Sequence, residues 1–260
     1  MIPKIIHYCW FGNNPKTQLI NYCIESWKKY LSDYEIIEWN ESNFNLNENE
    51  FVKSAYKNKK WAFVSDYVRA YVLYLHGGIY LDSDVEIKQN LNQFLHHGAF
   101  SGFEKSGFPF TALWASQKNH IWPKKVLDYY NGLETYSEET NTIIVTQILI
   151  DDFEVNPSND EFQLLKNDIA IYPSHFFCLD LNQNFATHHF NGSWLDAKIP
   201  FKENLHRHYY SKKYFETLSD KSILQDLLDY NAITLKEIFV FFIENAFKKI
   251  KKKITKLIKI

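Results

Sequence analysis

One segment constrains the fold of this chain more than any other, because a helix, a double glycine and a strand follow one another without a gap. Residues 62–76 have apolar side chains at helical spacing, which predicts a helix. Gly77-Gly78 comes next, and glycine readily adopts the left-handed conformation that ends a helix. Ile79-Tyr80-Leu81 then predicts a buried strand that ends in Asp82-Ser83-Asp84. This order indicates an α/β protein with polar groups at a strand end.

The rest of the chain continues this alternation. Its apolar patterns predict strands over residues 2–8, 34–39, 85–87 and 170–173, and helices over 16–30, 50–57, 119–130 and 142–151. Residues 94–116 predict further strands and loops, and the chain after about residue 201 is mostly helical in pattern. We therefore expect a layered α/β domain with a mostly parallel central sheet over residues 1–200, and a helical extension over 201–260.

Composition agrees with a globular protein and excludes several classes. The 260 residues are 45% hydrophobic and 17% aromatic, enough for a sizeable core without disulfides. The three cysteines are odd in number and form no CxxC pair, so the sequence supports neither a disulfide scaffold nor a cysteine zinc site. The start of the chain does not resemble a secretory signal, and no apolar run of about 18 residues occurs. The sequence thus predicts a cytoplasmic protein.

Charge is unevenly distributed along the chain. The formal net charge is −2, but residues 246–260 hold seven lysines and no acid, which leaves a net charge of −9 on the other 245 residues. From Leu235 onward the apolar residues step by three or four, which predicts a basic amphipathic helix suited to an anionic membrane surface. The alternative is an ordinary terminal helix that packs on the body through the same stripe. An acidic body and a basic run without aromatics argue against nucleic-acid binding.

Asp82 and Asp84 are the first candidates for chemistry. They are two residues apart in an extended segment, so their carboxylates are expected on the same side. Hard cations such as Mg²⁺ or Mn²⁺ take oxygen ligands and keep positions for phosphate oxygens. Strand ends in open α/β sheets are also where ligands bind. The pair therefore predicts a divalent metal site, with a solvated acidic turn as the alternative.

Arginine is scarce, since only Arg69 and Arg207 occur among 29 basic residues. Asp66 and Arg69 are three residues apart on the predicted helix and share a face. A carboxylate and a guanidinium in this position are suited to sugar hydroxyls and phosphate oxygens. The alternative is a local ion pair on the helix surface, which stabilises a protein little.

Aromatic and imidazole side chains supply further candidates. Trp10 leaves the first predicted strand, where its ring is suited to stack on a nucleobase, with a core position as the alternative. His188 and His189 lie at another strand exit, shortly before Ser193 and Trp194. A neutral imidazole completes a metal site that two carboxylates leave open. The alternative is a structural or exposed histidine, since the chain has ten.

Three blocks of the sequence resemble one family. The segment AFVSDYVRAYVLYLHGGIYLDSDV, residues 62–85, closely resembles the DXD-containing glycosyltransferases of family 32, which include yeast initiating mannosyltransferases and many bacterial capsule and lipopolysaccharide transferases. It also resembles the catalytic domain of the clostridial glucosylating toxins. The blocks IPKIIHYCWFG at 2–12 and HHFNGSW at 188–194 agree in the same order.

The resemblance implies a GT-A fold, which is an α/β nucleotide-binding sandwich, with a bound Mn²⁺ or Mg²⁺. By the match, Trp10 stacks on the base and favours uracil, and hence a UDP-sugar donor. Asp66 and Arg69 hold the ribose and the transferred sugar. Asp82 binds the donor, and the metal directly or through water, while Asp84 binds the metal.

The last block adds the remaining expected ligands. Of the two histidines, His189 is the one expected to bind the metal, because its spacing to Gly192 fits the family pattern better than that of His188. Ser193 and Trp194 match the serine and tryptophan that touch the metal and the leaving diphosphate in the toxins.

The function implied is metal-dependent transfer, with retention of configuration, of a hexose or N-acetylhexosamine from a nucleotide sugar to a growing capsule, lipopolysaccharide or exopolysaccharide. Asp82, Asp84 and Arg69 are expected to act in catalysis by stabilising charge as the sugar–diphosphate bond breaks. A glycan or lipid-linked acceptor, and a peripheral position on the inner face of the cell membrane through residues 246–260, are consistent with the basic tail. The alternative is a toxin-like effector that glycosylates a protein.

Overall fold

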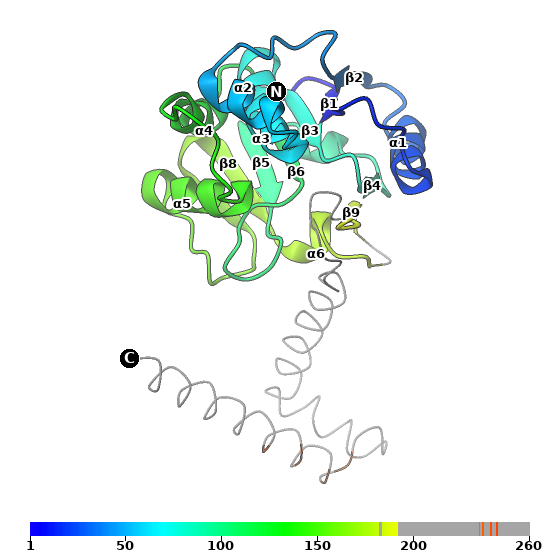
Figure 1. Ribbon diagram of the computed structural model, residues 1–260. Helices are drawn as coiled ribbons and strands as arrows, with labels where there is room; N and C mark the ends of the chain where they lie inside the picture. Colours follow the sequence, from blue (N-terminus) through cyan, green and yellow to red (C-terminus); the bar gives the residue numbers. More distant parts are fainter. Residues whose placement is uncertain (182–183, 192–233, 235, 237–239, 241–242, 244–260) are drawn as a thin grey trace. The chain divides into compact units, whose positions relative to one another are not determined.

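The computed structural model describes residues 1–181 and 184–191, together with residues 234, 236, 240 and 243. Within this part of the chain a twisted seven-stranded sheet lies between helices (Figure 1). In spatial order its strands are β2 (Glu35–Trp39), β1 (Ile5–Cys9), β3 (Gly78–Leu81), β6 (Leu113–Ser116), β5 (Ala99–Gly102), β8 (Ile169–Tyr172) and β7 (Gln163–Leu165).

Five of these seven strands run in the same direction. β1 pairs in parallel with β2 and β3, and β5 pairs in parallel with β8. β6 and β7 run the opposite way. The predicted α/β fold with a mostly parallel central sheet is therefore confirmed. The sequence did not predict that antiparallel β6 lies between β3 and β5.

Helices connect most of the parallel strands. The α-helices described are α1 (Gln18–Tyr30), α2 (Glu50–Lys57), α3 (Trp61–His76), α4 (Ile121–Asn131), α5 (Asn141–Phe153) and α6 (Ser174–Phe177), and the short 3-10 helices are η1 (Asn92–Phe94) and η2 (Lys166–Asp168). The helix predicted at 50–57 coincides with α2, and those predicted at 16–30 and 62–76 differ from α1 and α3 by one or two residues at their starts. Periodicity therefore located these helices from local sequence alone.

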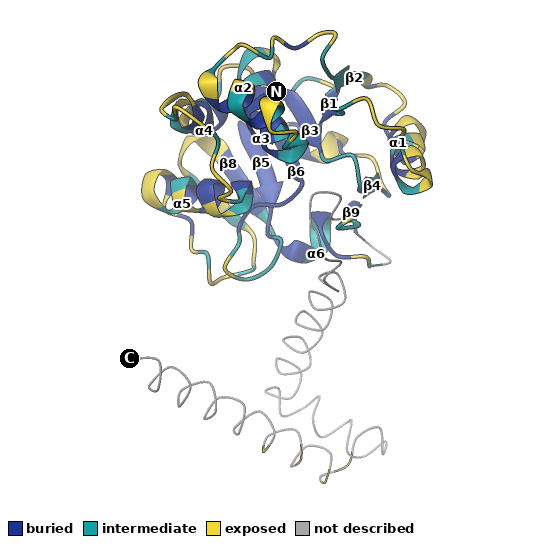
Figure 2. Cartoon of the chain, in the orientation of Figure 1, coloured by how far each residue is buried: buried dark blue, intermediate teal, exposed yellow. Residues whose placement is uncertain are grey.

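Two apolar clusters cover the two faces of the sheet, and its central strands are buried (Figure 2). Successive residues of a strand point to opposite faces. Tyr80 accordingly packs in the cluster that contains residues of α2 to α5, whereas Ile79 and Leu81 pack in the one that contains residues of α1 and α6. This arrangement is the three-layer sandwich expected for a parallel α/β sheet.

The double glycine joins α3 to β3. Both glycines adopt positive φ, +69° at Gly77 and +106° at Gly78, as the sequence predicts. The ψ of Gly77 is −170°, however, so its backbone is extended in ψ and is not a left-handed helical cap. A Cβ atom on Gly77 would lie 2.6 Å from the backbone N of Lys118, and one on Gly78 would lie 2.6 Å from the carbonyl of Ile5. Space as well as φ therefore requires glycine at both positions.

A second, two-stranded sheet stands beside the main one. β4 (Val85–Ile87) follows the aspartate pair and is antiparallel to β9 (Ala186–His188). Helix α1 holds β4, because Trp27 Nε1 donates to the Val85 carbonyl at 2.7 Å and Ile87 N donates to Ser26 Oγ at 2.9 Å. Pairing of β4 with β9 brings together segments that lie about a hundred residues apart in the chain.

The chain divides into two compact units, Met1–His206 and Arg207–Ile260. Only single residues of the second unit are described, so the domain division predicted at residue 200 and the amphipathic helix predicted over 246–260 lie outside the described residues. Among the residues described, no helix combines the length and the apolar character needed to cross a bilayer. The three cysteines are buried and form no disulfide.

Candidate functional site

The carboxyl ends of β1 and β3 meet at one edge of the sheet. The two strands are parallel, with His7 opposite Tyr80, so Trp10 and Asp82 lie just beyond neighbouring strand ends. The Asp82 N–H donates to the Ala112 carbonyl at 2.9 Å, and the Val85 N–H donates to the Asp82 carbonyl at 3.0 Å. These bonds shape the turn from β3 into β4 that presents both aspartates.

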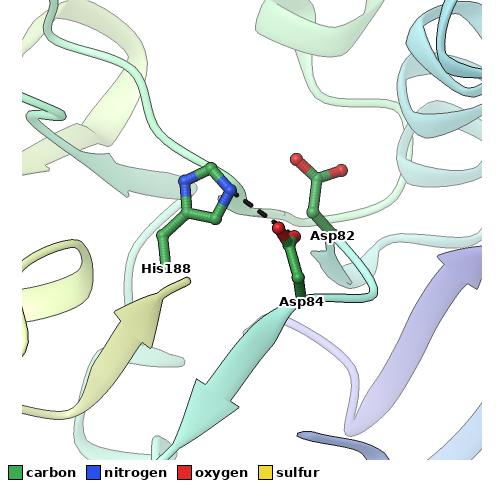
Figure 3. A group of neighbouring side chains, drawn as sticks. All are labelled: Asp82, Asp84 and His188. Carbon is green, nitrogen blue, oxygen red and sulfur yellow. Dashed lines mark ion pairs between the residues drawn. The ribbon is translucent and has the colours of Figure 1, made fainter. Parts of the chain in front are cut away.

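Asp82, Asp84 and His188 form a group that can hold a metal ion (Figure 3). One ligand atom of each side chain lies within 4.8 Å of the others, and all three are partly buried. His188 ends β9 opposite Val85, and its Nε2 lies 3.5 Å from Asp84 Oδ1. Two carboxylates and one imidazole suit a divalent ion of the Mn²⁺ or Mg²⁺ class, so the donor set fits the metal that the sequence predicts.

The surroundings of Asp84 keep it ionised. The backbone N–H of Asn191 donates to Asp84 Oδ2 at 2.8 Å. Burial alone raises the pKa of Asp84, but His188 and the Asn191 N–H outweigh burial and lower this pKa to about 2. Burial lowers the pKa of His188, whereas the Asp84 carboxylate raises it above the usual value. Asp84 is therefore a carboxylate at any pH near neutrality, as a metal ligand must be.

His189, which the family spacing favoured as the metal ligand, occupies a different place. Its Nε2 lies 3.0 Å from Oε2 of Glu86, and Glu86 Oε1 accepts a hydrogen bond from the Tyr22 hydroxyl at 2.7 Å. Neighbouring side chains at a strand end point to opposite sides, so only one of the two histidines faces the aspartates. The pairing of β9 with β4 selects His188. The structure thus groups His188, and not the expected His189, with Asp82 and Asp84, and which histidine binds the metal stays a prediction.

Arg69 links the helix α3 to the aspartate turn. Its Nη2 lies 3.0 Å from Asp66 Oδ1 and 3.1 Å from Asp82 Oδ1, and its guanidinium lies over the ring of Tyr80 at 4.8 Å. The Asp66–Arg69 pair is buried, with side chains about a tenth exposed, and is not the solvated surface pair weighed as the alternative. Burial raises the pKa of Asp66 to about 7 although Arg69 opposes this shift. Sequence reasoning missed Tyr80, which packs against the guanidinium.

Trp10 is only partly buried. It follows β1, so it lies on one side of Asp82, and β6 lies on the other side. Its Nε1 donates to the Asn14 carbonyl at 2.7 Å, which orients the indole, and the ammonium of Lys16 lies 5.3 Å from the ring. The N–H of Gly12, which has a φ of +90°, donates to Glu41 Oε1 at 2.7 Å. An oriented aromatic ring at the strand edge is suited to stacking.

Two expected site residues, Ser193 and Trp194, lie outside the described residues, so their predicted contacts with the leaving diphosphate stay predictions. The described site thus collects Asp66, Arg69, Asp82 and Asp84, with His188 in place of His189, and has Trp10 at its margin.

Residues 17–101 match the family described as "Glycosyltransferase sugar-binding region containing DXD motif". The uncharacterized glycosyltransferase L373 of Acanthamoeba polyphaga mimivirus is 28% identical over 183 residues, which are 62% of this chain and 69% of that protein. Inositol phosphoceramide mannosyltransferase 3 of Schizosaccharomyces pombe is 31% identical over 113 residues, which are 38% of this chain and 29% of that protein. Residues 17–101 therefore carry a sugar-binding region of the DXD-type glycosyltransferases, and the resemblance found in the motifs is confirmed.

Solved glycosyltransferases are also similar in structure. The enzyme involved in glycosylation of the PBCV-1 major capsid matches with a TM-score of 0.44 and 13% identity, over 79% of this chain and all of that one. The galactosyltransferase LgtC, solved with donor and acceptor sugar analogs, matches with a TM-score of 0.41 and 10% identity, over 78% of this chain and 94% of that one.

Proposed function

We propose that this chain transfers a hexose or N-acetylhexosamine from a nucleotide sugar to a growing surface glycan, with retention of configuration and with a divalent cation. The observation that carries the proposal is the convergence of Asp82, Asp84 and His188 at the strand edge, beside the buried Asp66–Arg69 pair. The matched sugar-binding region spans four of these five residues, all except His188.

Charge explains why such a group suits sugar transfer. Breaking a sugar–diphosphate bond places negative charge on the leaving diphosphate and positive charge on the anomeric carbon. A cation held by Asp82, Asp84 and His188 would supply charge stabilisation at the diphosphate. Arg69 is already oriented by Asp66 and Asp82, so its guanidinium is preorganised for phosphate or sugar oxygens.

The donor we propose is a UDP-sugar. Trp10 matches the family tryptophan that stacks on uracil, and its indole is held in one orientation by Asn14. The ammonium of Lys16, which pairs with Glu38 at 2.8 Å, lies 5.3 Å from the same ring. We propose a lipid-linked glycan of a capsule, lipopolysaccharide or exopolysaccharide as the acceptor. The fission-yeast relative is named for inositol phosphoceramide, which is a lipid, and this name supports an acceptor that carries a lipid.

A donor-hydrolysis panel tests the function. UDP- and GDP-linked glucose, galactose, mannose and N-acetylhexosamines are incubated with the full chain and Mn²⁺, and free nucleotide is measured. We expect at least one UDP-sugar to be cleaved, with loss of cleavage in EDTA and in Asp84→Ala. The matched control is Glu134→Gln, an exposed acid far from the site in sequence, which should leave the rate unchanged. Cleavage of no sugar nucleotide, or full activity in EDTA, contradicts the proposal.

We also propose that residues 246–260, with their seven lysines, bind an anionic membrane surface and hold the enzyme near its acceptor. This proposal rests on the sequence, since these residues lie outside those described. Vesicles of phosphatidylglycerol and phosphatidylcholine are sedimented with the full chain and with a chain that ends at residue 245. Equal binding of the two forms contradicts the proposal, and binding of the full chain alone supports it.

A further inference from the structure

Glu41 is a partly buried acid two residues beyond the end of β2, and the function proposed above gives it no role. Its Oε1 accepts two hydrogen bonds, one from the Gly12 N–H at 2.7 Å and one from the Tyr56 hydroxyl at 3.2 Å. Its Oε2 is buried and has no hydrogen-bond partner among the residues that the structure describes. The described hydrogen bonds of this carboxylate therefore all pass through Oε1, which joins the loop after β1 to helix α2.

The loop of residues 10–16, which carries Trp10, is tied to β2 at both ends. The Trp10 N–H donates to the carbonyl of the last residue of β2 at 2.9 Å. The Lys16 ammonium lies 2.8 Å from Oε2 of Glu38, which is also in β2. The bond to Glu41 lies between these two contacts, so Glu41 holds the interior of the loop.

The turn inside this loop has an unusual backbone. Gly12 and Asn13 adopt φ values of +90° and +54° in succession. A side chain on Gly12 has no room, because a Cβ atom there would lie 2.6 Å from Nε1 of Trp61, at the start of α3. Positive φ is costly for residues other than glycine and persists where neighbouring contacts enforce it. The bond from the Gly12 N–H to Glu41 is such a contact.

The same turn determines how the Trp10 ring is held. Trp10 Nε1 donates to the Asn14 carbonyl at 2.7 Å, and Asn14 is two residues beyond Gly12. The peptide that orients the indole is therefore placed by the turn that Glu41 holds. A ring held in one orientation before binding loses less conformational entropy when a ligand stacks on it.

We propose that Glu41 is a positioning residue for the nucleotide: through Gly12 it holds residues 10–16 in the conformation in which Trp10 receives the base. This role rests on the proposed function, in which Trp10 stacks on the base of a UDP-sugar. Glu41 is not a member of the metal group described above. Loss of its carboxylate is therefore expected to weaken binding of the nucleotide and to leave binding of the metal and the diphosphate intact.

Two probes separate binding of the base from binding of the diphosphate. The full chain is titrated calorimetrically with UDP and with inorganic diphosphate, each with Mn²⁺, and the KM and kcat are measured for hydrolysis of the UDP-sugar that the wild type cleaves fastest. We expect Glu41→Ala to raise the Kd of UDP and the KM about tenfold, because the loop loses a hydrogen bond to a charged group. The Kd of diphosphate and the kcat should stay within about twofold of the wild type, since a change in ground-state binding alone acts on KM.

Three further variants sharpen the test. Glu41→Gln keeps an oxygen that can accept both bonds, so it should restore the Kd of UDP to within about threefold of the wild type. Tyr56→Phe removes only the hydroxyl that steadies the carboxylate and should raise the Kd of UDP roughly threefold. The matched control Glu35→Ala removes an exposed acid at the other end of β2 and should change neither Kd. Thermal unfolding shows whether each variant is folded, and if Glu41→Ala is not, Tyr56→Phe decides with the same two probes.

Three outcomes overturn the proposal. One is an unchanged Kd of UDP in Glu41→Ala, or in Tyr56→Phe where Glu41→Ala does not fold. An equal rise in the Kd of both probes assigns Glu41 to the whole site, and failure of Glu41→Gln to restore binding indicates that the carboxylate contacts the nucleotide itself. A wild-type chain that binds no UDP contradicts the proposed donor, and this outcome is distinct from a wild type that binds UDP and tolerates Glu41→Ala.

Discussion

At the scale of single residues, the two adjacent histidines have different partners. His188 faces the aspartates, whereas His189 pairs with Glu86. Replacing each histidine is therefore expected to change the metal requirement to a different extent. We expect His188→Ala to raise the Mn²⁺ concentration for half-maximal donor hydrolysis at least tenfold, because one of three protein ligands is lost. His189→Ala should raise it less than threefold. Manganese titration of activity measures both, and equal effects of the two changes would contradict the assignment of His188.

Arg69 should not be replaceable by lysine. Its guanidinium pairs with Asp66 and Asp82 together, and a single ammonium lacks the planar fork that makes both contacts. We expect Arg69→Lys to lower the rate of donor hydrolysis at least 100-fold and the free energy of unfolding by about 1.5–3 kcal/mol, the usual size of a lost buried charged hydrogen bond. Urea unfolding and single-turnover rates report the two effects. A variant with wild-type values of both would show that the buried pair has no role.

At the scale of elements, His7 connects β1, β2 and the end of α3. It is fully buried; its Nδ1 accepts from Trp39 Nε1 at 3.1 Å, so its Nε2 carries the proton and donates to the Gly77 carbonyl at 2.8 Å. Burial lowers the pKa of His7 to about 4, and the nearby His76 adds to this shift, while the bond to Gly77 opposes it. Both ring nitrogens of the neutral imidazole thus have a hydrogen-bond partner, and His7 joins the three elements.

This arrangement predicts a loss of stability in mild acid. The folded pKa lies below the unfolded value of about 6.5, so the unfolded chain binds more protons below that pH. The contribution of neutral His7 to the free energy of unfolding is full above pH 6.5. It falls by about 1.4 kcal/mol per pH unit as the pH is lowered toward 4. Urea unfolding of the wild type and of His7→Gln at pH 6.5 and 5.0 tests this. Between the two pH values the free energy of unfolding should fall by roughly 2 kcal/mol more in the wild type than in His7→Gln. Parallel declines would contradict this interpretation.

At the scale of the whole molecule, the metal group joins segments that are distant in the chain. Asp82 and Asp84 lie between β3 and β4, and His188 lies at the end of β9. A cation bound to all three stabilises the folded state, because the unfolded chain does not bring them together. At a Mn²⁺ concentration 100 times the dissociation constant, the gain is about 2.7 kcal/mol.

Thermal unfolding with and without Mn²⁺ measures this gain. We expect the Tm of the wild type to rise by roughly 5–10 °C, from about 2–4 °C per kcal/mol in a protein of this size. His188→Ala and Asp84→Asn should lose most of the rise, and His189→Ala should retain it. An equal rise in all four proteins would mean that Mn²⁺ binds elsewhere.

Much of the fold and part of the site could be predicted from the sequence. Helix α3, the double glycine, strand β3 and the aspartate pair were all expected, because helical periodicity, glycine conformations and an apolar run are local properties. For Asp66 and Arg69 the sequence allowed either an ion pair on the helix surface or a place in the binding site. It could not decide, because exposure depends on what packs against the helix. The structure shows the pair buried and joined to Asp82.

The sequence by itself determined the class of the chain and the order of its central elements, because motif and periodicity are written in consecutive residues. Only the tertiary structure decided that antiparallel β6 separates β3 from β5, that Tyr80 lies under Arg69, and that β9 pairs with β4. The choice of His188 over His189 follows from that last pairing. A slip of one residue in a strand exchanges its faces, so no local pattern could select the histidine that meets the aspartates.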